Sequence, residues 1–265
     1  MQNCAYCDAD NVKLTKEHLW PASLHKRIDE ANRAYLGHPN LFYLAKIDKT
    51  IVGEPQIKDV CAGCNNGVLS ELDGYICRLW DTYFSRIVEA GHKVQFNYDY
   101  DRLSRWLLKM CYNSSRIHNS DVAHLRKCRG YILGHTAHPD NVIIHLQLAK
   151  PSDFTEDERE AVKEIGMKVR RYEPRLNRVG HLAYITRAGV GRLIRTVHLQ
   201  SYLFLIHVFP QKVPLASRRM DLEDFNKVMP YAVKLSPGSH ECEVECEGLD
   251  SKASFYSHYM NKNTP

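Results

Sequence analysis

The sequence predicts an α+β protein in which a small metal-stapled domain precedes a larger domain of mixed helices and strands. Two Cys-x-x-Cys couples, Cys4–Cys7 and Cys61–Cys64, are separated by 53 residues. A long segment with helical periodicity follows the second couple, and mostly strand-like segments follow residue 135. These observations predict a first domain over residues 1–90 and a second domain over residues 91–265.

The composition is that of a globular protein that buries a core. Of 265 residues, 44% are hydrophobic and 25% are charged. The longest apolar run, over 202–210, is far shorter than the ~20 residues of a membrane helix, so we expect no membrane association. The N-terminal segment has no basic region followed by an apolar stretch. We therefore expect a cytoplasmic protein, in which nine cysteines are not a disulfide framework.

The elements of the first domain follow from periodicity and turn residues. Residues 11–17 alternate in polarity and predict a strand that ends at Glu17-His18, and Pro21 prevents its continuation. From residue 68 to residue 88, apolar side chains recur every three or four positions and predict a long helix. Between these two elements we expect a helix over 22–35, a turn over 37–40 and extended segments over 41–52.

The second domain is predicted to contain both element types. Cys242 and Cys246 share one face of its last strand, which favours core packing over a second metal site. The predicted helices cover 101–118, 121–133, 155–165 and 221–229. The predicted strands cover 92–98, 141–149, 181–186, 196–209, 232–235 and 241–246.

The two couples are typical of a structural zinc site. Each couple presents two thiolates to one cation, and two couples together complete a tetrahedral sulfur site. Such a site closes the intervening chain into a loop and brings its polar residues near the start of the long helix. The expected Zn²⁺ ligands are Cys4, Cys7, Cys61 and Cys64.

The order of these motifs resembles the zinc-stapled branch of the HNH endonucleases, whose core is a ββα-metal hairpin and helix. The resemblance covers about the first quarter of the chain. It rests on the two couples, on Glu17-His18 followed by Pro21, and on Asn65 directly after the second couple. It implies an endonuclease that hydrolyses DNA phosphodiester bonds, and it suggests an effector in a bacterial or phage system.

The resemblance also implies a role for each polar residue. His18 would be the general base that takes a proton from water, while Glu17 and Asn65 would hold a catalytic Mg²⁺ or Mn²⁺ ion. Gln56 falls at the family's middle position, which is typically Asn, and would orient His18. Because the insert between His18 and the second couple is long, Asn40 is an alternative for this position.

The net charge of +5 is unevenly distributed. Residues 1–78 carry −1 and the remainder carries +6, which suits a polyanionic partner such as DNA. The densest basic stretch supplies our candidate nucleic-acid-binding residues, with a solvated basic face as an equally weighted interpretation. These residues are Arg170, Arg171, Arg175 and Arg178.

Two other functions stay open from the sequence. A non-catalytic zinc module in a nucleic-acid-binding or regulatory protein would contain the same cysteines, with Glu17-His18 as a coincidence. An interaction protein would use the first domain only to dock a partner. If the protein is a nuclease, one active site per chain favours a homodimer for double-strand breaks.

Overall fold

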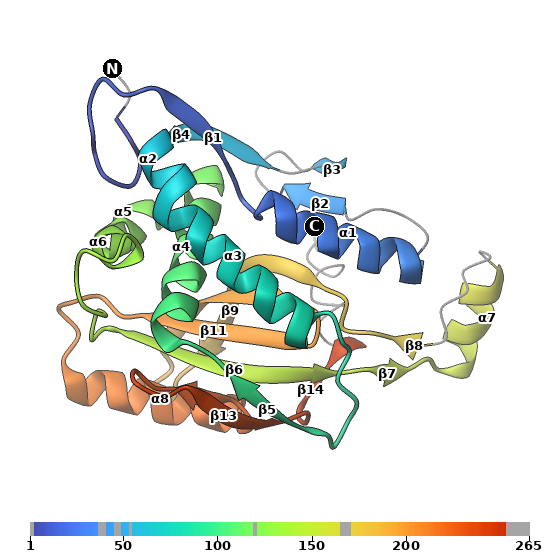
Figure 1. Ribbon diagram of the computed structural model, residues 1–265. Helices are drawn as coiled ribbons and strands as arrows, with labels where there is room; N and C mark the ends of the chain where they lie inside the picture. The colour runs from blue at the N-terminus through green and yellow to red at the C-terminus, as the bar shows by residue number, and fades with distance from the viewer. Residues whose placement is uncertain are drawn as a thin grey trace.

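The computed structural model describes residues 3–36, 41–44, 49–52, 55–118, 121–164 and 171–252. A six-stranded sheet lies at its centre, with α4 (Tyr100–His118) on one face and α8 (Leu215–Val228) on the other (Figure 1). This mixture of helices and sheets confirms the predicted α+β class. Within the described residues, no helix combines the length and the apolar character needed to cross a membrane.

The central sheet has the strand order β12-β6-β11-β10-β9, and β14 pairs with β6. Along β11, Phe204 and Ile206 enter the core under α4, whereas Leu203 and Leu205 pack against Phe225 of α8. This alternation follows from the two-residue period of a strand. The strands are β6 (Val142–Lys150), β9 (Asn177–Ile185), β10 (Gly191–Leu199), β11 (Tyr202–Val208), β12 (Val233–Leu235) and β14 (Leu249–Asp250).

The single strand predicted over 196–209 is a hairpin formed by the end of β10 and by β11. Leu199 lies opposite Tyr202, so the connecting turn has only two residues. Gln200 in this turn has a φ of 52°, the left-handed conformation that short hairpin turns use. The prediction was wrong because no Gly, Asn or Asp marks the turn. A tertiary contact accompanies the turn instead, since Ser201 Oγ accepts a hydrogen bond of 3.0 Å from the Val88 amide.

The N-terminal part contains two antiparallel strands followed directly by a helical run. In the strand pair of β1 (Leu14–His18) and β4 (Gln56–Cys61), His18 lies opposite Gln56. The helical run confirms the predicted long helix, although it ends at Phe84 rather than near residue 88. It consists of α2 (Ala62–Cys64), η2 (Asn65–Leu69), α3 (Ser70–Leu79) and η3 (Trp80–Phe84).

Most of the remaining elements follow the predictions, but the short strands over 152–153 and 171–172 were not predicted, and α8 begins at Leu215 rather than near residue 221. The helix predicted over 121–133 is three short helical segments, and the turn predicted over 37–40 lies outside the described residues. These elements are α1 (Ala22–Leu36), β2 (Leu41–Leu44), β3 (Lys49–Val52), β5 (Lys93–Asn97), α5 (Val122–Leu125), η4 (Arg126–Cys128), α6 (Arg129–Ile132), β7 (Ser152–Asp153), α7 (Glu156–Glu164), β8 (Arg171–Tyr172) and β13 (Glu241–Glu245).

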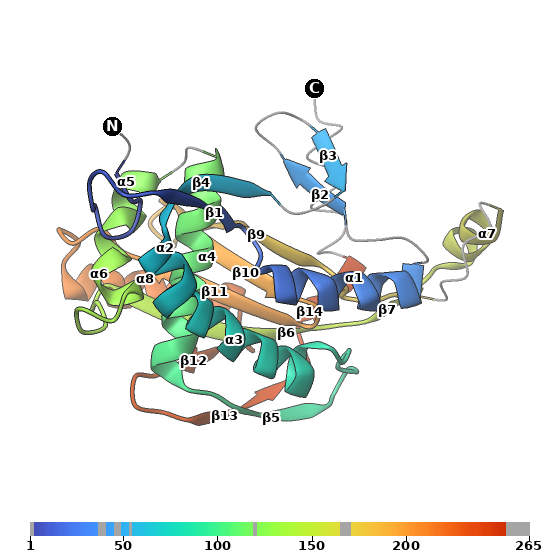
Figure 2. The same ribbon diagram turned by 45° about the horizontal axis from the view of Figure 1, so that its top comes forward.

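One hydrophobic core includes residues from both sides of the boundary predicted at residue 90. Its buried side chains include Trp20 and Phe84 from the first part and Trp106 and Phe204 from the second. The rings of Trp20 and Trp106 have centroids 6.3 Å apart, and α3 packs along α4 (Figure 2). The division into two domains stays a prediction, but the packing of α4 connects the two parts.

Two buried histidines lie on the sheet face that α8 covers. The ring centroids of His145 and His207 are 5.3 Å apart, and both rings contact Phe225. Neither ring nitrogen of His207 has a hydrogen-bond partner among the described residues. Burial lowers the pKa of His145 to about 4 and the pKa of His207 to about 3. Both rings are therefore neutral in the folded protein at neutral pH.

We expect these histidines to destabilise the fold in acid. A histidine in the unfolded chain takes up a proton below its ordinary pKa of ~6.5, whereas the folded protein does not, so the free energy of unfolding falls as the pH falls. His207→Leu should reduce this loss by up to about 1.4 kcal/mol per pH unit. Urea unfolding at several pH values between neutral and acid checks this. The exposed control His240→Gln should follow the wild type, and an equal pH dependence in His207→Leu would contradict the assignment.

Candidate functional site

The four cysteines of the two couples meet at one point. Their sulfur atoms all lie within 4.8 Å of one another, and the Cys7 and Cys61 sulfurs are 3.8 Å apart. Four sulfurs placed ~2.3 Å from a zinc ion form a tetrahedron with edges of about 3.8 Å. The donor set and its spacing therefore fit a zinc ion, as the sequence predicted.

Backbone amides favour the thiolate form of Cys4, whereas burial raises the pKa of the Cys7 and Cys64 thiols. The Cys61 amide donates to Cys4 Sγ over 3.3 Å, and the Cys64 amide donates to Cys61 Sγ over 3.5 Å. Burial would raise the pKa of the Cys4 thiol, but backbone N–H groups of Cys61, Cys7 and Tyr6 outweigh it and lower the pKa to about 7. Hydrogen bonds to a thiolate favour the charged form that a metal needs.

We expect about one zinc ion per chain, and we expect Cys64→Ser to lose it. Because the ion joins the N-terminal turn to the end of β4, its loss should lower the free energy of unfolding by about 4 kcal/mol or more. Elemental analysis and urea unfolding measure both quantities. The matched control is Cys242→Ser on β13, outside the cluster, which should keep its zinc. Equal zinc content in the two variants would contradict the site.

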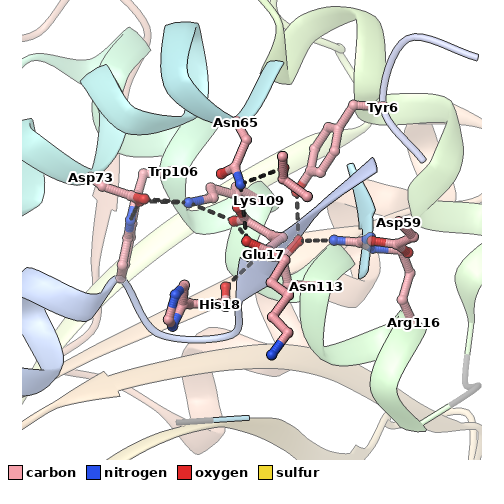
Figure 3. Close-up of polar contacts among 12 residues, drawn as sticks. Tyr6, Glu17, His18, Asp59, Asn65, Asp73, Trp106, Lys109, Asn113 and Arg116 are labelled. Atoms are coloured by element: carbon pink, nitrogen blue, oxygen red, sulfur yellow. Dashed lines mark hydrogen bonds and ion pairs between the residues drawn. The ribbon is translucent and has the colours of Figure 1, made fainter. Parts of the chain in front are cut away.

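The strand pair separates the predicted catalytic residues by face. Glu17 is only 4% exposed and points toward Lys109 of α4 (Figure 3). Its neighbour His18 lies beside Gln56, with 3.3 Å between Gln56 Nε2 and His18 Nδ1. Successive strand residues point to opposite faces, which accounts for this separation. The structure thus brings His18 and Gln56 together and gives Glu17 a different set of partners.

Glu17 forms an ion pair with Lys109, a lysine in the helix predicted over 101–118. Lys109 is fully buried, and its Nζ lies 3.0 Å from Glu17 Oε1 and 2.6 and 2.7 Å from the two oxygens of Asp73 (Figure 3). Burial would lower the pKa of Lys109, but Asp73 and Glu17 outweigh burial and raise it. Lys109 is therefore a buried ammonium between two carboxyl groups, one from β1 and one from α3.

Asn113, one turn further along α4, joins the same network. Its Nδ2 donates to Glu17 Oε1 over 3.1 Å and to the His18 carbonyl over 3.2 Å. Its Oδ1 accepts hydrogen bonds from Tyr6 and Arg116, and Arg116 also pairs with Asp59 of β4. The buried polar stripe of α4 therefore holds both strands of the candidate site.

The polar stripe of α4 is visible in the sequence as a helical pattern. Trp106, Lys109, Asn113 and Arg116 recur every three or four residues along one side of the helix. A lysine and an asparagine at such positions indicate buried polar partners elsewhere. The identity of those partners, Glu17 and its neighbours, depends on a tertiary contact and had no local signal.

Asn65 lies at the start of the helical run, as predicted. Its Nδ2 donates to Thr15 Oγ1 over 2.9 Å and to the Lys16 carbonyl over 3.0 Å. These bonds join the helical run to β1, one residue before Glu17. Asn40, the alternative for the middle position, lies outside the described residues.

Two of the four candidate nucleic-acid-binding arginines form ion pairs with carboxylates of the protein. Arg171 Nη2 lies 2.7 Å from Glu89, and Arg175 Nε lies 2.7 Å from Glu173. Arg178 is half-buried, and burial lowers its pKa. Arg170 lies outside the described residues. A role in DNA binding stays a prediction for these residues, and for Arg171 and Arg175 it would require the exchange of a carboxylate partner for a phosphate.

Comparisons with models of protein families, with curated proteins and with solved structures gave no match to this chain. The site is therefore interpreted from its own geometry. That geometry comprises a four-cysteine cluster, a histidine–glutamine pair across two strands, and a buried Glu–Lys–Asp triad behind them.

We expect the buried triad to be essential for the fold. Lys109→Met leaves two carboxyl groups without their cation and should cost about 3–5 kcal/mol of unfolding free energy, measured by urea denaturation. The exposed control Lys234→Met should change it by less than about 0.5 kcal/mol. Adding Glu17→Gln and Asp73→Asn to Lys109→Met should recover most of the loss, and a mild effect of Lys109→Met alone would contradict the triad.

Proposed function

We propose that the protein is a metal-dependent HNH-type endonuclease that hydrolyses DNA phosphodiester bonds. The observation that carries the proposal is the register of β1 and β4, in which His18 faces Gln56 at the end of the strand pair. The four-cysteine cluster and the start of the helical run near Asn65 lie at the other end of the strand pair, where Leu14 faces Cys61. Two strands followed by a helix, with a zinc site at their junction, agree with the order that the sequence resemblance implies.

In this proposal His18 is the general base. The terminal amide of Gln56 presents either its nitrogen or its oxygen after a rotation of 180°. With Oε1 toward His18, Gln56 accepts a hydrogen bond from Nδ1–H, and the imidazole keeps a lone pair on Nε2. That nitrogen takes a proton from the attacking water, which is a role suited to an imidazole at neutral pH.

Glu17 and Asn65 are the proposed holders of a catalytic Mg²⁺ or Mn²⁺ ion. Lys109 and Asn113 both contact Oε1 of Glu17, and the bonds of Asn65 use its Nδ2. We assign the ion to Glu17 Oε2 and Asn65 Oδ1, since oxygen ligands suit both metals. When bound, such an ion neutralises charge on the phosphate and on the departing oxygen.

The charges of the buried triad are compatible with a bound cation. Glu17 and Asp73 contribute two negative charges and Lys109 contributes one positive charge, so the triad has a net charge of −1 in its ionised form. Lys109 therefore does not make the surroundings of Glu17 positive. It fixes one carboxylate oxygen in place, which orients the other.

Cleavage of supercoiled plasmid by the zinc-loaded protein tests the proposal. We expect nicking with Mg²⁺ or Mn²⁺ and none without them, and His18→Ala should lower the rate about 10²–10⁴-fold, the contribution of a positioned general base. The exposed control His240→Ala should cut like the wild type. Undiminished cutting by His18→Ala would contradict the assigned base.

One observation favours a second function. The burial of Glu17 and its bonds to Lys109 and Asn113 also suit a purely structural carboxylate in a non-catalytic zinc module of a nucleic-acid-binding or regulatory protein. Such a module would contain zinc and show no metal-dependent cleavage in either the wild type or His18→Ala. The plasmid assay therefore distinguishes the two functions.

A further inference from the structure

The outer face of the β1–β4 pair contains two lysines directly opposite each other. Lys16 pairs with Lys58 in the strand register, one step from the pair of His18 and Gln56. Both lysines are exposed. Since residues two apart on a strand share a face, the four side chains project to the same side. We call this set of four residues the outer strand face.

The opposite face of the same two strands contains their acidic residues. Glu17 pairs with Lys109, and Asp59 pairs with Arg116. Both cations come from α4, so the negative charges of the strands are neutralised behind the sheet. The charge on the outer strand face is therefore exclusively positive.

The two opposed lysines repel each other, and no described residue offsets this repulsion. Like charges directly opposite on neighbouring strands destabilise a sheet, and neither Lys16 nor Lys58 has an ion-pair partner among the residues that the structure describes. Another exposed strand lysine of the chain lies near an opposite charge. On β5, Lys93 lies 2.8 Å from Glu243 of the neighbouring strand.

We propose that the outer strand face binds the sugar-phosphate backbone of DNA, with Lys16 and Lys58 holding a phosphate next to the scissile one, which is attacked by the water that His18 deprotonates. This inference rests on the proposed nuclease function and adds two substrate-binding residues to it. The two rows of side chains are ~7 Å apart along the strands. Asn65 holds the Lys16 carbonyl at 3.0 Å, which fixes this part of the face relative to the helical run.

Salt-dependent DNA binding tests the proposal. The probe is a labelled duplex, and its affinity for the zinc-loaded full chain is measured by fluorescence anisotropy without added Mg²⁺ or Mn²⁺. For Lys16→Gln/Lys58→Gln we expect the slope of log K against log salt to become about 0.9 units less negative, because the two lysines hold one phosphate and each neutralised phosphate contributes ~0.9. At ~0.1 M salt the affinity should fall about tenfold or more.

The matched control is Lys93→Gln/Lys234→Gln, which removes two exposed strand lysines elsewhere and changes the net charge equally. It should keep the wild-type slope. An equal effect of both double variants, an unchanged slope in Lys16→Gln/Lys58→Gln, or no DNA binding by the wild type would overturn the proposal. Preferential binding of polyglutamate over DNA of equal charge would assign the face to an acidic protein and also overturn it.

Failure of this inference and failure of the nuclease function are distinguishable. Lysine-dependent DNA binding by a wild type that cuts no plasmid would support the outer strand face and refute the nuclease. Plasmid cutting with the same KM in the wild type and in Lys16→Gln/Lys58→Gln would overturn the outer strand face alone. Zinc content equal to that of the wild type establishes that the variants are folded at the site.

Discussion

The structure depends on one buried cation. Lys109 joins a carboxyl group from β1 to a carboxyl group from α3, and it projects from α4 between them. Removing a lysine from water is costly, and only close opposite charges with further hydrogen bonds compensate that cost. Here Asp73 also accepts a hydrogen bond from Trp106, and Glu17 accepts one from Asn113. The need to satisfy this ammonium therefore fixes three elements relative to one another, and the strand that holds His18 is one of them.

The cations of α4 also determine which charged side chains lie on each face of the β1–β4 pair. Because α4 presents Lys109 and Arg116 to the inner face, Glu17 and Asp59 turn inward, and the lysines of the two strands are left on the solvent side. A hairpin with mixed charges on one face would repel a phosphate as much as attract it. Because the inner ion pairs neutralise the acidic residues, the outer strand face, which includes His18, is left positively charged.

The parts of this protein that could be predicted from the sequence are those with a local signal. The cysteine couples have a fixed spacing within each turn, and the four sulfurs do meet. Apolar periodicity located α1, α4 and the long helical run within a few residues. The β10–β11 turn was missed because Gln200 takes a left-handed conformation without a typical turn residue. The partners of Glu17 were missed because Lys109 and Asn113 are distant in sequence, and no local pattern tells which carboxylate a buried lysine meets.

The larger part of the chain supports the candidate site through α4. α4 contacts the central sheet on its other side, where the buried Arg195 of β10 donates to the Cys111 carbonyl over 3.0 Å. One turn of the same helix therefore binds the sheet, and the turns before and after it bind β1 and β4. A shift of the sheet against α4 would move Lys109, Asn113 and Arg116 together, and with them both strands that hold His18 and Gln56. The position of the proposed general base is thus set by packing far outside the segment that contains its motif.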